Sequence, residues 1–307
     1  MLPRVSQLAR HLAAPSRLFA QTTRRPCPIS KMTTLQERCT RTIRTGACLI
    51  IGNEVLGGQT NSAYVAKWCF CLGIELQRTE VIPDVEDDIK EAVRRMSSLY
   101  DFVVTSGGIG PTHDDITYES IAKAFELKLM RHEETFARMK ELSRNPEFDW
   151  ETDSPSLRAK LRMATLPTDE SRSMSDQCVF PVKDLWVPVS IVNGNVHILP
   201  GVPALFVKLL DGLEPHLRSR LDKPFARVMI STPQPESVSA GYLTTLAAKV
   251  KSLGVKVGSY PRWGKERNTI TLVGSDLKVL ENLVPEVEEN VQGRRVETVD
   301  ELDHLDD

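Results

Sequence analysis

The sequence has little of what would place it in a membrane, on a nucleic acid or in an oxidising compartment. No apolar run approaches the roughly 20 residues of a membrane-spanning helix, so we expect no membrane span. The 39 basic and 41 acidic residues leave a net charge of −2, which argues against a nucleic-acid partner. The six cysteines include no Cys-x-x-Cys pair, a usage typical of reduced thiols rather than of disulfides or structural zinc.

Acidic residues are also absent from the N-terminal stretch, where Glu37 is the first. Basic residues are spread through that stretch among leucine, alanine and serine: Arg4, Arg10, Arg17, Arg24, Arg25 and Lys31. Such a composition resembles a mitochondrial transit peptide, and the alternative is a disordered basic tail. We therefore expect residues 1–43 to be a leader and the protein to be mitochondrial. Met32 would start a shorter, cytoplasmic form.

Apolar runs and helical periodicity alternate after this leader. The pattern predicts strands near 47–51, 74–82 and 102–104, and helices over 61–72, over 85–99 and from residue 117. Alternating strands and helices are typical of an α/β fold, in which helices cover both faces of a mainly parallel sheet.

The second half of the sequence predicts an extension of this domain and then a second one. Helices are expected over 131–143 and 156–163, followed by a long surface loop over 166–185. Asn193 and Gly194 between two apolar runs predict a β-hairpin. After residue 223 the order strand, helix, strand, strand, helix predicts a small α+β domain. We place the two domains at 44–222 and 223–307.

A glycine-rich segment between a predicted strand and a predicted helix is the strongest functional signal. Residues 105–117 read TSGGIGPTHDDIT. Gly107, Gly108 and Gly110 allow a sharp bend whose backbone comes close to a ligand. Free N–H groups beside a helix N-terminus favour phosphate. The segment lacks the Gly-Lys-Ser/Thr of a P-loop and the spacing of a dinucleotide fingerprint. The alternative is a tight turn in which Asp115 or Thr117 caps the helix.

Carboxylates near this segment predict a divalent cation. Asp114 and Asp115 directly follow the glycines, and Glu54 follows the first strand, whose end can lie close by. Oxygen ligands of this kind suit a Mg²⁺-like cation that neutralises phosphate and activates water. We expect Asp114 and Asp115 to be both catalytic and metal-ligating.

Further candidates come from hydroxyl, amide and glycine positions. We expect Ser106 and Thr112 to bind phosphate and Asn61 to contact the ligand, although turn hydrogen bonds or helix capping would also explain these three residues. Gly201 lies between two prolines and is expected to bring its backbone close to the ligand. His113 is either a proton donor or a solvated loop histidine.

Three motifs together resemble one family. They are GNEVLGG at 52–58, GGIGPTHDDIT at 107–117 and LPGVP at 199–203. In this order they look like the molybdopterin-binding domain of MoaB and Mog proteins. The variety most similar is that of competence-damage-inducible (CinA-type) proteins and of eukaryotic FAD synthases. The resemblance spans about 44–222, and 224–295 resemble the middle segment of those FAD synthases. It implies a three-layer α/β/α domain that is often oligomeric.

The resemblance also implies candidate activities. Members of this branch are metal-dependent pyrophosphatases acting on FAD or ADP-ribose, and others bind or adenylylate molybdopterin. The acidic positions of the family map onto Asp114 and Asp115, with Glu54 at the first strand. Asn53 departs from the usual Asp, and Gln59 stands where an Asp-Thr-Asn segment usually begins.

Our first hypothesis is a pyrophosphatase that uses Mg²⁺ or Co²⁺, cleaves FAD to FMN and AMP or cleaves ADP-ribose, and forms a homo-oligomer. The alternatives are a molybdopterin-handling protein and a non-catalytic nucleotide-binding regulator.

Overall fold

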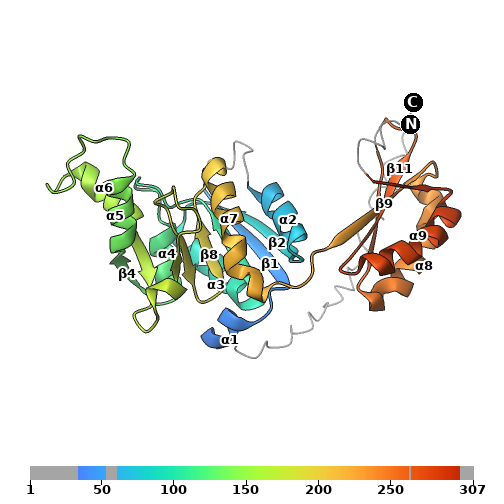
Figure 1. Ribbon diagram of the computed structural model, residues 1–307, viewed down its shortest axis with the longest axis horizontal. Coiled ribbons are helices and arrows are strands. Elements are labelled where there is room, and N and C mark those ends of the chain that lie inside the picture. The colour runs from blue at the N-terminus through green and yellow to red at the C-terminus, as the bar shows by residue number, and fades with distance from the viewer. Residues whose placement is uncertain (1–33, 53–60, 263, 298–307) are drawn as a thin grey trace, which may run out of the picture. The chain divides into compact units, whose positions relative to one another are not determined.

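The computed structural model describes residues 34–52, 61–262 and 264–297 (Figure 1). The expected transit peptide therefore lies almost wholly outside the described residues, as do Asn53, Glu54 and Gln59. The last part of the expected leader belongs to the folded domain. Helix α1 (Leu35–Thr40) begins with a capping box between Thr34 and Glu37. Ile43 is fully buried, and its N–H donates to the Arg220 carbonyl.

Six strands of the described chain form one sheet, in the order β2-β1-β3-β8-β7-β6. Strand β1 pairs in parallel with β2 and β3, and β3 pairs in parallel with β8. The β7–β8 hairpin at Asn193 and Gly194 was correctly predicted. The strands are β1 (Thr45–Ile51), β2 (Glu75–Ile82), β3 (Phe102–Ser106), β6 (Cys178–Val179), β7 (Val189–Val192) and β8 (Val196–Leu199).

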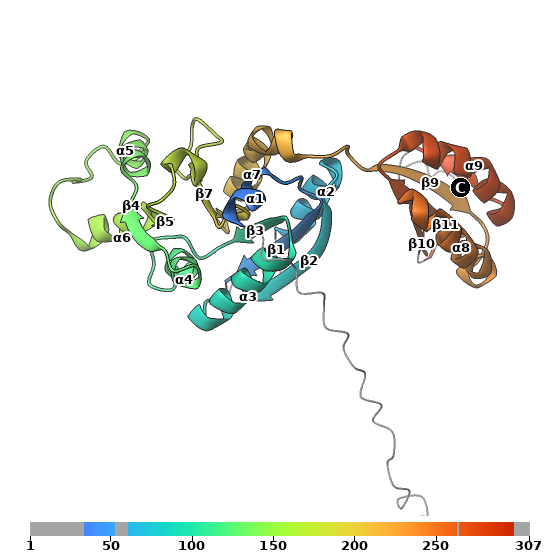
Figure 2. The same cartoon turned by 90° about the horizontal axis from the view of Figure 1, so that it is seen from below.

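Helices cover both faces of this sheet, as the alternating pattern predicted. Figure 2 shows α2 and α7 on one face and α3 and α4 on the other. The strand order explains why α2 and α3 lie on different faces. The connection from β1 to β2 and the connection from β2 to β3 cross the sheet in opposite directions, and because both crossovers are right-handed, their helices cover opposite faces. The helices are α2 (Ser62–Cys71), α3 (Glu86–Leu99), α4 (Thr117–Ala124) and α7 (Pro203–Leu217). The three-layer α/β/α prediction is confirmed.

The segment between α4 and β7 differs from the expected surface loop over 166–185. It contains β5 (Thr165–Thr168), which pairs antiparallel with β4 (Lys128–Arg131). The turn η3 (Met174–Asp176) and the short strand β6 follow. Helices α5 (Glu133–Glu141) and α6 (Pro155–Met163) fill the interval between β4 and β5. Strands of two to four residues are too short for an alternating pattern to stand out, which is why the sequence read as a loop.

The C-terminal domain is the expected small α+β unit with a core of its own. Its described strands form an antiparallel sheet in the order β10-β11-β9-β12. Apolar residues of its two long helices pack with β9 and β11. After η4 (Arg218–Arg220) the elements are β9 (Ala226–Thr232), α8 (Glu236–Val250), η5 (Lys251–Leu253), β10 (Lys256–Tyr260), β11 (Asn268–Gly274), α9 (Leu277–Val291) and β12 (Arg294–Val296). The sequence did not predict β12. Across the described ranges, no helix is long and apolar enough to cross a membrane.

Candidate functional site

Three helices begin near the carboxyl ends of three adjacent parallel strands. Helix α2 lies after β1, α4 after β3 and α7 directly after β8. Their N-cap residues, Asn61, Ile116 and Val202, make no side-chain capping hydrogen bond. Uncapped N-terminal N–H groups carry partial positive charge. This edge of the sheet therefore favours an anionic ligand.

The glycine segment forms the bend between β3 and α4. Gly107 and Gly108 have φ angles of +109° and +65°. A Cβ at Gly107 would lie 2.1 Å from the Ile51 carbonyl oxygen, and one at Gly108 would lie 2.2 Å from the Thr117 hydroxyl. Thr117 Oγ1 donates to the Gly107 carbonyl at 3.0 Å, so Thr117 braces the bend instead of capping α4. Both the backbone conformation and the crowding require glycine here.

Consecutive amides in this bend are left without acceptors. Among the described residues, the N–H groups of Gly108, Ile109 and Gly110 donate to no protein acceptor, whereas the Gly107 N–H donates to the Leu199 carbonyl. A run of unpaired N–H groups in such a bend is an anion-binding arrangement. This geometry agrees with the prediction that the loop offers free N–H groups as donors for phosphate.

Asn61, Ser106 and Gly201 come together, although they lie far apart in the sequence. Asn61 Nδ2 donates to Ser106 Oγ at 2.8 Å and to the Gly201 carbonyl at 3.0 Å. Ser106 and Asn61 are only 2% and 6% exposed. The Asn61 amide thus connects the start of α2 with the ends of β3 and β8 and does not cap α2. These contacts position the loops, so the expected direct contacts of Ser106 and Asn61 with a ligand stay predictions.

The neighbouring carboxylates differ in their surroundings. Asp115 Oδ2 accepts from Thr112 N at 2.9 Å and from Thr112 Oγ1 at 2.5 Å. Asp115 therefore closes the loop on itself and does not cap α4. The Asp114 side chain is 60% exposed, and the polar surroundings that Thr112 and the loop backbone provide keep its pKa below the usual value. Asp114 is ionised at neutral pH and accessible to a cation. His113 is almost fully exposed, with Nδ1 3.9 Å from Asp114 Oδ1.

A cavity of about 310 Å³ lies against the glycine bend. Gly107, Gly108 and Gly110 form one part of its wall, together with Asp115 and Gly201. Its remaining lining is mainly apolar and includes Met163, Trp186, Val187, Pro200, Val202 and Leu205. A smaller cavity of about 200 Å³ lies beyond Gly110 and Asp115 and is lined by Arg158 and Arg162. Arg162 Nη2 donates to the Asp115 carbonyl at 3.1 Å.

Sequence reasoning missed the apolar and basic part of this lining. Met163 and Arg162 lie on α6, whereas Trp186 and Val187 lie in an irregular segment with no motif. Neither segment shows a pattern that links it to the glycine loop. From the sequence alone, Trp186 is recognisable only as a large aromatic residue and Arg162 only as a basic residue.

Two carboxylates of the described chain are compatible with a divalent cation that is shared with phosphate. No group of three or more His, Cys, Asp or Glu side chains in this part of the chain is arranged to hold a metal ion. Glu54, the third expected ligand, lies outside the described residues. Mg²⁺ is commonly bound by one or two carboxylates plus substrate phosphates and water. Exposed Asp114 and the free Oδ1 of Asp115 fit that arrangement.

The fold and site together define an α/β ligand-binding domain whose cavity lies at the carboxyl edge of a mainly parallel sheet. Residues 47–219 match the family described as a probable molybdopterin binding domain. The chain belongs to this family, so the resemblance inferred from the three motifs is confirmed.

Several relatives extend over most of the chain. A probable FAD synthase of Caenorhabditis elegans is 30% identical over 268 residues, which are 82% of this chain and 51% of that protein. A CinA-like protein of Anaeromyxobacter dehalogenans is 28% identical over 74% of this chain and 55% of its own length. The chain thus spans about half the length of these two relatives. An Archaeoglobus fulgidus protein is 28% identical, with 80% of this chain and 97% of that protein covered.

Among solved structures, CinA of Thermoplasma acidophilum is 29% identical. The match covers 57% of this chain and 98% of that chain, with a TM-score of 0.47.

Proposed function

We propose that the protein is a divalent-metal-dependent nucleotide pyrophosphatase acting on FAD or on an ADP-ribose-like substrate. One observation carries the proposal: the unpaired N–H groups of Gly108, Ile109 and Gly110 lie at a cavity with apolar walls that the Asp115 carboxylate also lines, and the exposed Asp114 is next to Asp115 in the sequence. A diphosphate needs donors, a cation partner and space for a flat ring. These residues supply all three.

Each part of the site has a separate task. The Gly108–Gly110 amides bind phosphate oxygens, assisted by the uncapped N-terminus of α4. Trp186, Val187 and Val202 provide apolar surface for a heteroaromatic ring. Asp114 and Asp115 hold the cation, and Thr112 fixes the orientation of the Asp115 carboxylate.

The proposed reaction is hydrolysis of a phosphoanhydride. A bound divalent cation supplies charge neutralisation and an activated water. Water oxygen bonds to one phosphorus atom while the bridging oxygen leaves with the other, so FAD gives FMN and AMP. The loop amides would hold the phosphoryl groups in a fixed position during this exchange.

Product separation tests the proposal. The protein is incubated with FAD or ADP-ribose and with Co²⁺ or Mg²⁺, and AMP release is measured. Asp114→Asn keeps the shape and removes the charge, and we expect kcat/KM to fall about 100-fold. Asp149→Asn is the matched control, because Asp149 is an exposed loop carboxylate between α5 and α6, outside the glycine segment. Absence of AMP from every substrate, or full activity of Asp114→Asn, would refute the proposal.

A molybdopterin-handling role is the second candidate, and membership in the family favours it. A pterin is also flat and carries a phosphate, so the same cavity and amides suit it. In that case, AMP or pyrophosphate release would require pterin together with ATP. Tight binding of nucleotide or pterin without turnover of any substrate would instead indicate a non-catalytic regulator.

A further inference from the structure

A second, larger cavity lies at the other end of α7. It has a volume of about 620 Å³, within the usual range for small-molecule sites. Helix α7 is 15 residues long, and at 1.5 Å per residue this separates its two ends by about 22 Å. The glycine loop does not contribute to this second cavity. Its lining includes Cys39 of α1, Arg172 before η3, His197 of β8, His216 of α7, and Ser219 and Arg220 of η4.

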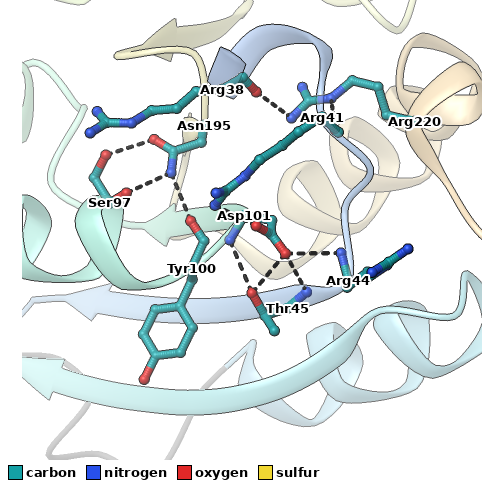
Figure 3. Close-up of polar contacts among 9 residues, drawn as sticks. All are labelled: Arg38, Arg41, Arg44, Thr45, Ser97, Tyr100, Asp101, Asn195 and Arg220. Atoms are coloured by element: carbon teal, nitrogen blue, oxygen red, sulfur yellow. Dashed lines mark hydrogen bonds and ion pairs between the residues drawn. The ribbon is translucent and has the colours of Figure 1, made fainter. Parts of the chain in front are cut away.

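Arg220 brings a largely buried guanidinium group to this cavity. Its Nε donates to the Arg41 carbonyl at 3.1 Å and its Nη2 to the Arg38 carbonyl at 2.7 Å, at the C-terminal end of α1 (Figure 3). No carboxylate of the described residues forms an ion pair with it. Asp101, the acid nearest in this network, instead pairs with Arg41 and accepts from the N–H groups of Arg44 and Thr45.

Arg172 provides a second cation to the lining of this cavity. Its Nη2 donates to the Asp176 carbonyl at 3.1 Å and lies 3.7 Å from Cys39 Sγ. Within the described ranges no carboxylate lies within ion-pair distance of it. Asp176 is the one carboxylate in the described lining, so two guanidinium groups face a single acid. The wall therefore carries net positive charge.

His197 adds an unsatisfied hydrogen-bond acceptor. It is 1% exposed, and its Nδ1 lies 3.3 Å from the Val103 carbonyl oxygen and 3.2 Å from that of Asn195. Because carbonyl oxygens only accept, Nδ1 carries the proton and Nε2 carries the lone pair. Nε2 has no partner among the described residues. Burial lowers the pKa of His197 to about 4, so the ring is neutral at physiological pH.

We infer that this cavity binds a small phosphorylated metabolite independently of the glycine loop, with the phosphate held by Arg172 and Arg220. Guanidinium groups are the usual partners of a phosphate dianion, and two of them line this cavity. A hydroxyl group of the same molecule is the donor that His197 Nε2 lacks. The bound molecule would also join α1 to the body of the domain, because the cavity is lined both by Cys39 of α1 and by residues of β8, α7 and η4.

Cys39 allows a direct test in the full-length protein. Its alkylation by N-ethylmaleimide is followed by peptide mass spectrometry, with exposed Cys71 on α2 as the internal reference. Inorganic phosphate, AMP and adenosine are the probes. We expect AMP to slow the reaction of Cys39 several-fold and to leave Cys71 unchanged, with adenosine inactive. Protection by inorganic phosphate would identify the free anion as sufficient, and protection by AMP alone would show that the ester is needed.

Variants connect the protection to the cavity. Arg172→Gln should weaken protection about tenfold or more, the effect of losing one charge-assisted hydrogen bond, whereas Arg172→Lys should lose less. Arg144→Gln, which removes an equivalent charge from an exposed loop outside the cavity, should have no effect. Protection should persist in Asp114→Asn. Unchanged Cys39 reactivity with both phosphate and AMP, equal protection in Arg172→Gln, or loss of protection in Asp114→Asn would overturn the inference.

Discussion

Replacing Asn61 tests whether one amide holds the candidate site together. Asn61 Nδ2 makes two hydrogen bonds, to Ser106 Oγ and to the Gly201 carbonyl, from a position 6% exposed. Asn61→Ala removes both. Each net hydrogen bond contributes about 1 kcal/mol, so we expect the free energy of unfolding to fall by about 2 kcal/mol. For a chain of this size, that corresponds to a melting temperature lower by roughly 4–8 °C.

Asn61→Asp is a sharper version of the same test. An ionised carboxylate at this position would face the Gly201 carbonyl and would be only slightly exposed, so we expect a larger loss at pH 7 than in Asn61→Ala. The folded state would raise the pKa of this aspartate, because only the protonated carboxyl can donate. Stability should therefore improve as pH is lowered toward 5. Asn145→Asp is the matched control, since Asn145 is exposed and uses Oδ1 only as an acceptor.

Urea denaturation of single and double variants provides the assay. Asn61 and Ser106 should couple by about 1 kcal/mol in a double-mutant cycle with Ser106→Ala, because they share one hydrogen bond. Additive losses would show that this hydrogen bond does not contribute to stability. A change of less than about 0.5 kcal/mol in Asn61→Ala, the usual scale for surface substitutions, would refute the argument that Asn61 joins the ends of β3 and β8.

Three further predictions address the bend, a buried histidine and α1. Gly108→Ala should abolish pyrophosphatase activity. Gly254 has a similar φ of +70° but open space around it, so Gly254→Ala should only lower the free energy of unfolding, by about 1 kcal/mol. AMP release measures the first effect and urea denaturation the second. The free energy of unfolding should fall by about 3 kcal/mol as pH drops from about 6.5 to 4, because His197 binds a proton in the unfolded chain but stays neutral in the folded one, where its pKa is lowered to about 4. A flat pH profile in the wild type, or an unchanged slope in His197→Gln, would contradict this. Arg220→Gln should accelerate proteolysis at α1 by releasing the Arg38 and Arg41 carbonyls, and the exposed Arg218→Gln should not.

The sequence predicted those parts of the fold that follow from regular patterns. The continuous apolar runs 47–51 in β1 and 102–104 in β3 required burial on both faces, which implied a parallel sheet between helices. Ile89, Val93 and Met96 on α3 are buried at the expected helical spacing. Periodicity failed where elements were too short to show it, as in β5, β6 and β12.

The sequence predicted the position of the candidate site more accurately than the contacts within it. The glycine bend lies at the expected edge of the sheet, because its residues are consecutive and their conformational demands are local. The role of Asn61 could not be predicted, since its partners, Ser106 and Gly201, are brought near only by the folded sheet. Asp115 was ambiguous for a different reason: a carboxylate can accept from the preceding loop or from the following helix, and the backbone path decides which.

Charge at this edge of the sheet supports a cation as part of the proposed site. The net charge of −2 provides no long-range attraction for a diphosphate, so attraction must come from local donors, namely the amides of Gly108, Ile109 and Gly110 and the N-termini of α2, α4 and α7. Asp114 and Asp115 oppose that attraction, because ionised carboxylates beside phosphate oxygens repel them. Thr112 nevertheless fixes the Asp115 carboxylate, and the polar surroundings of the loop keep the pKa of Asp114 low. A divalent cation between the carboxylates and the phosphate would remove this repulsion, because it attracts both. A loop that keeps negative charge beside an anion site is therefore the physical basis for proposing metal-dependent hydrolysis rather than simple anion binding.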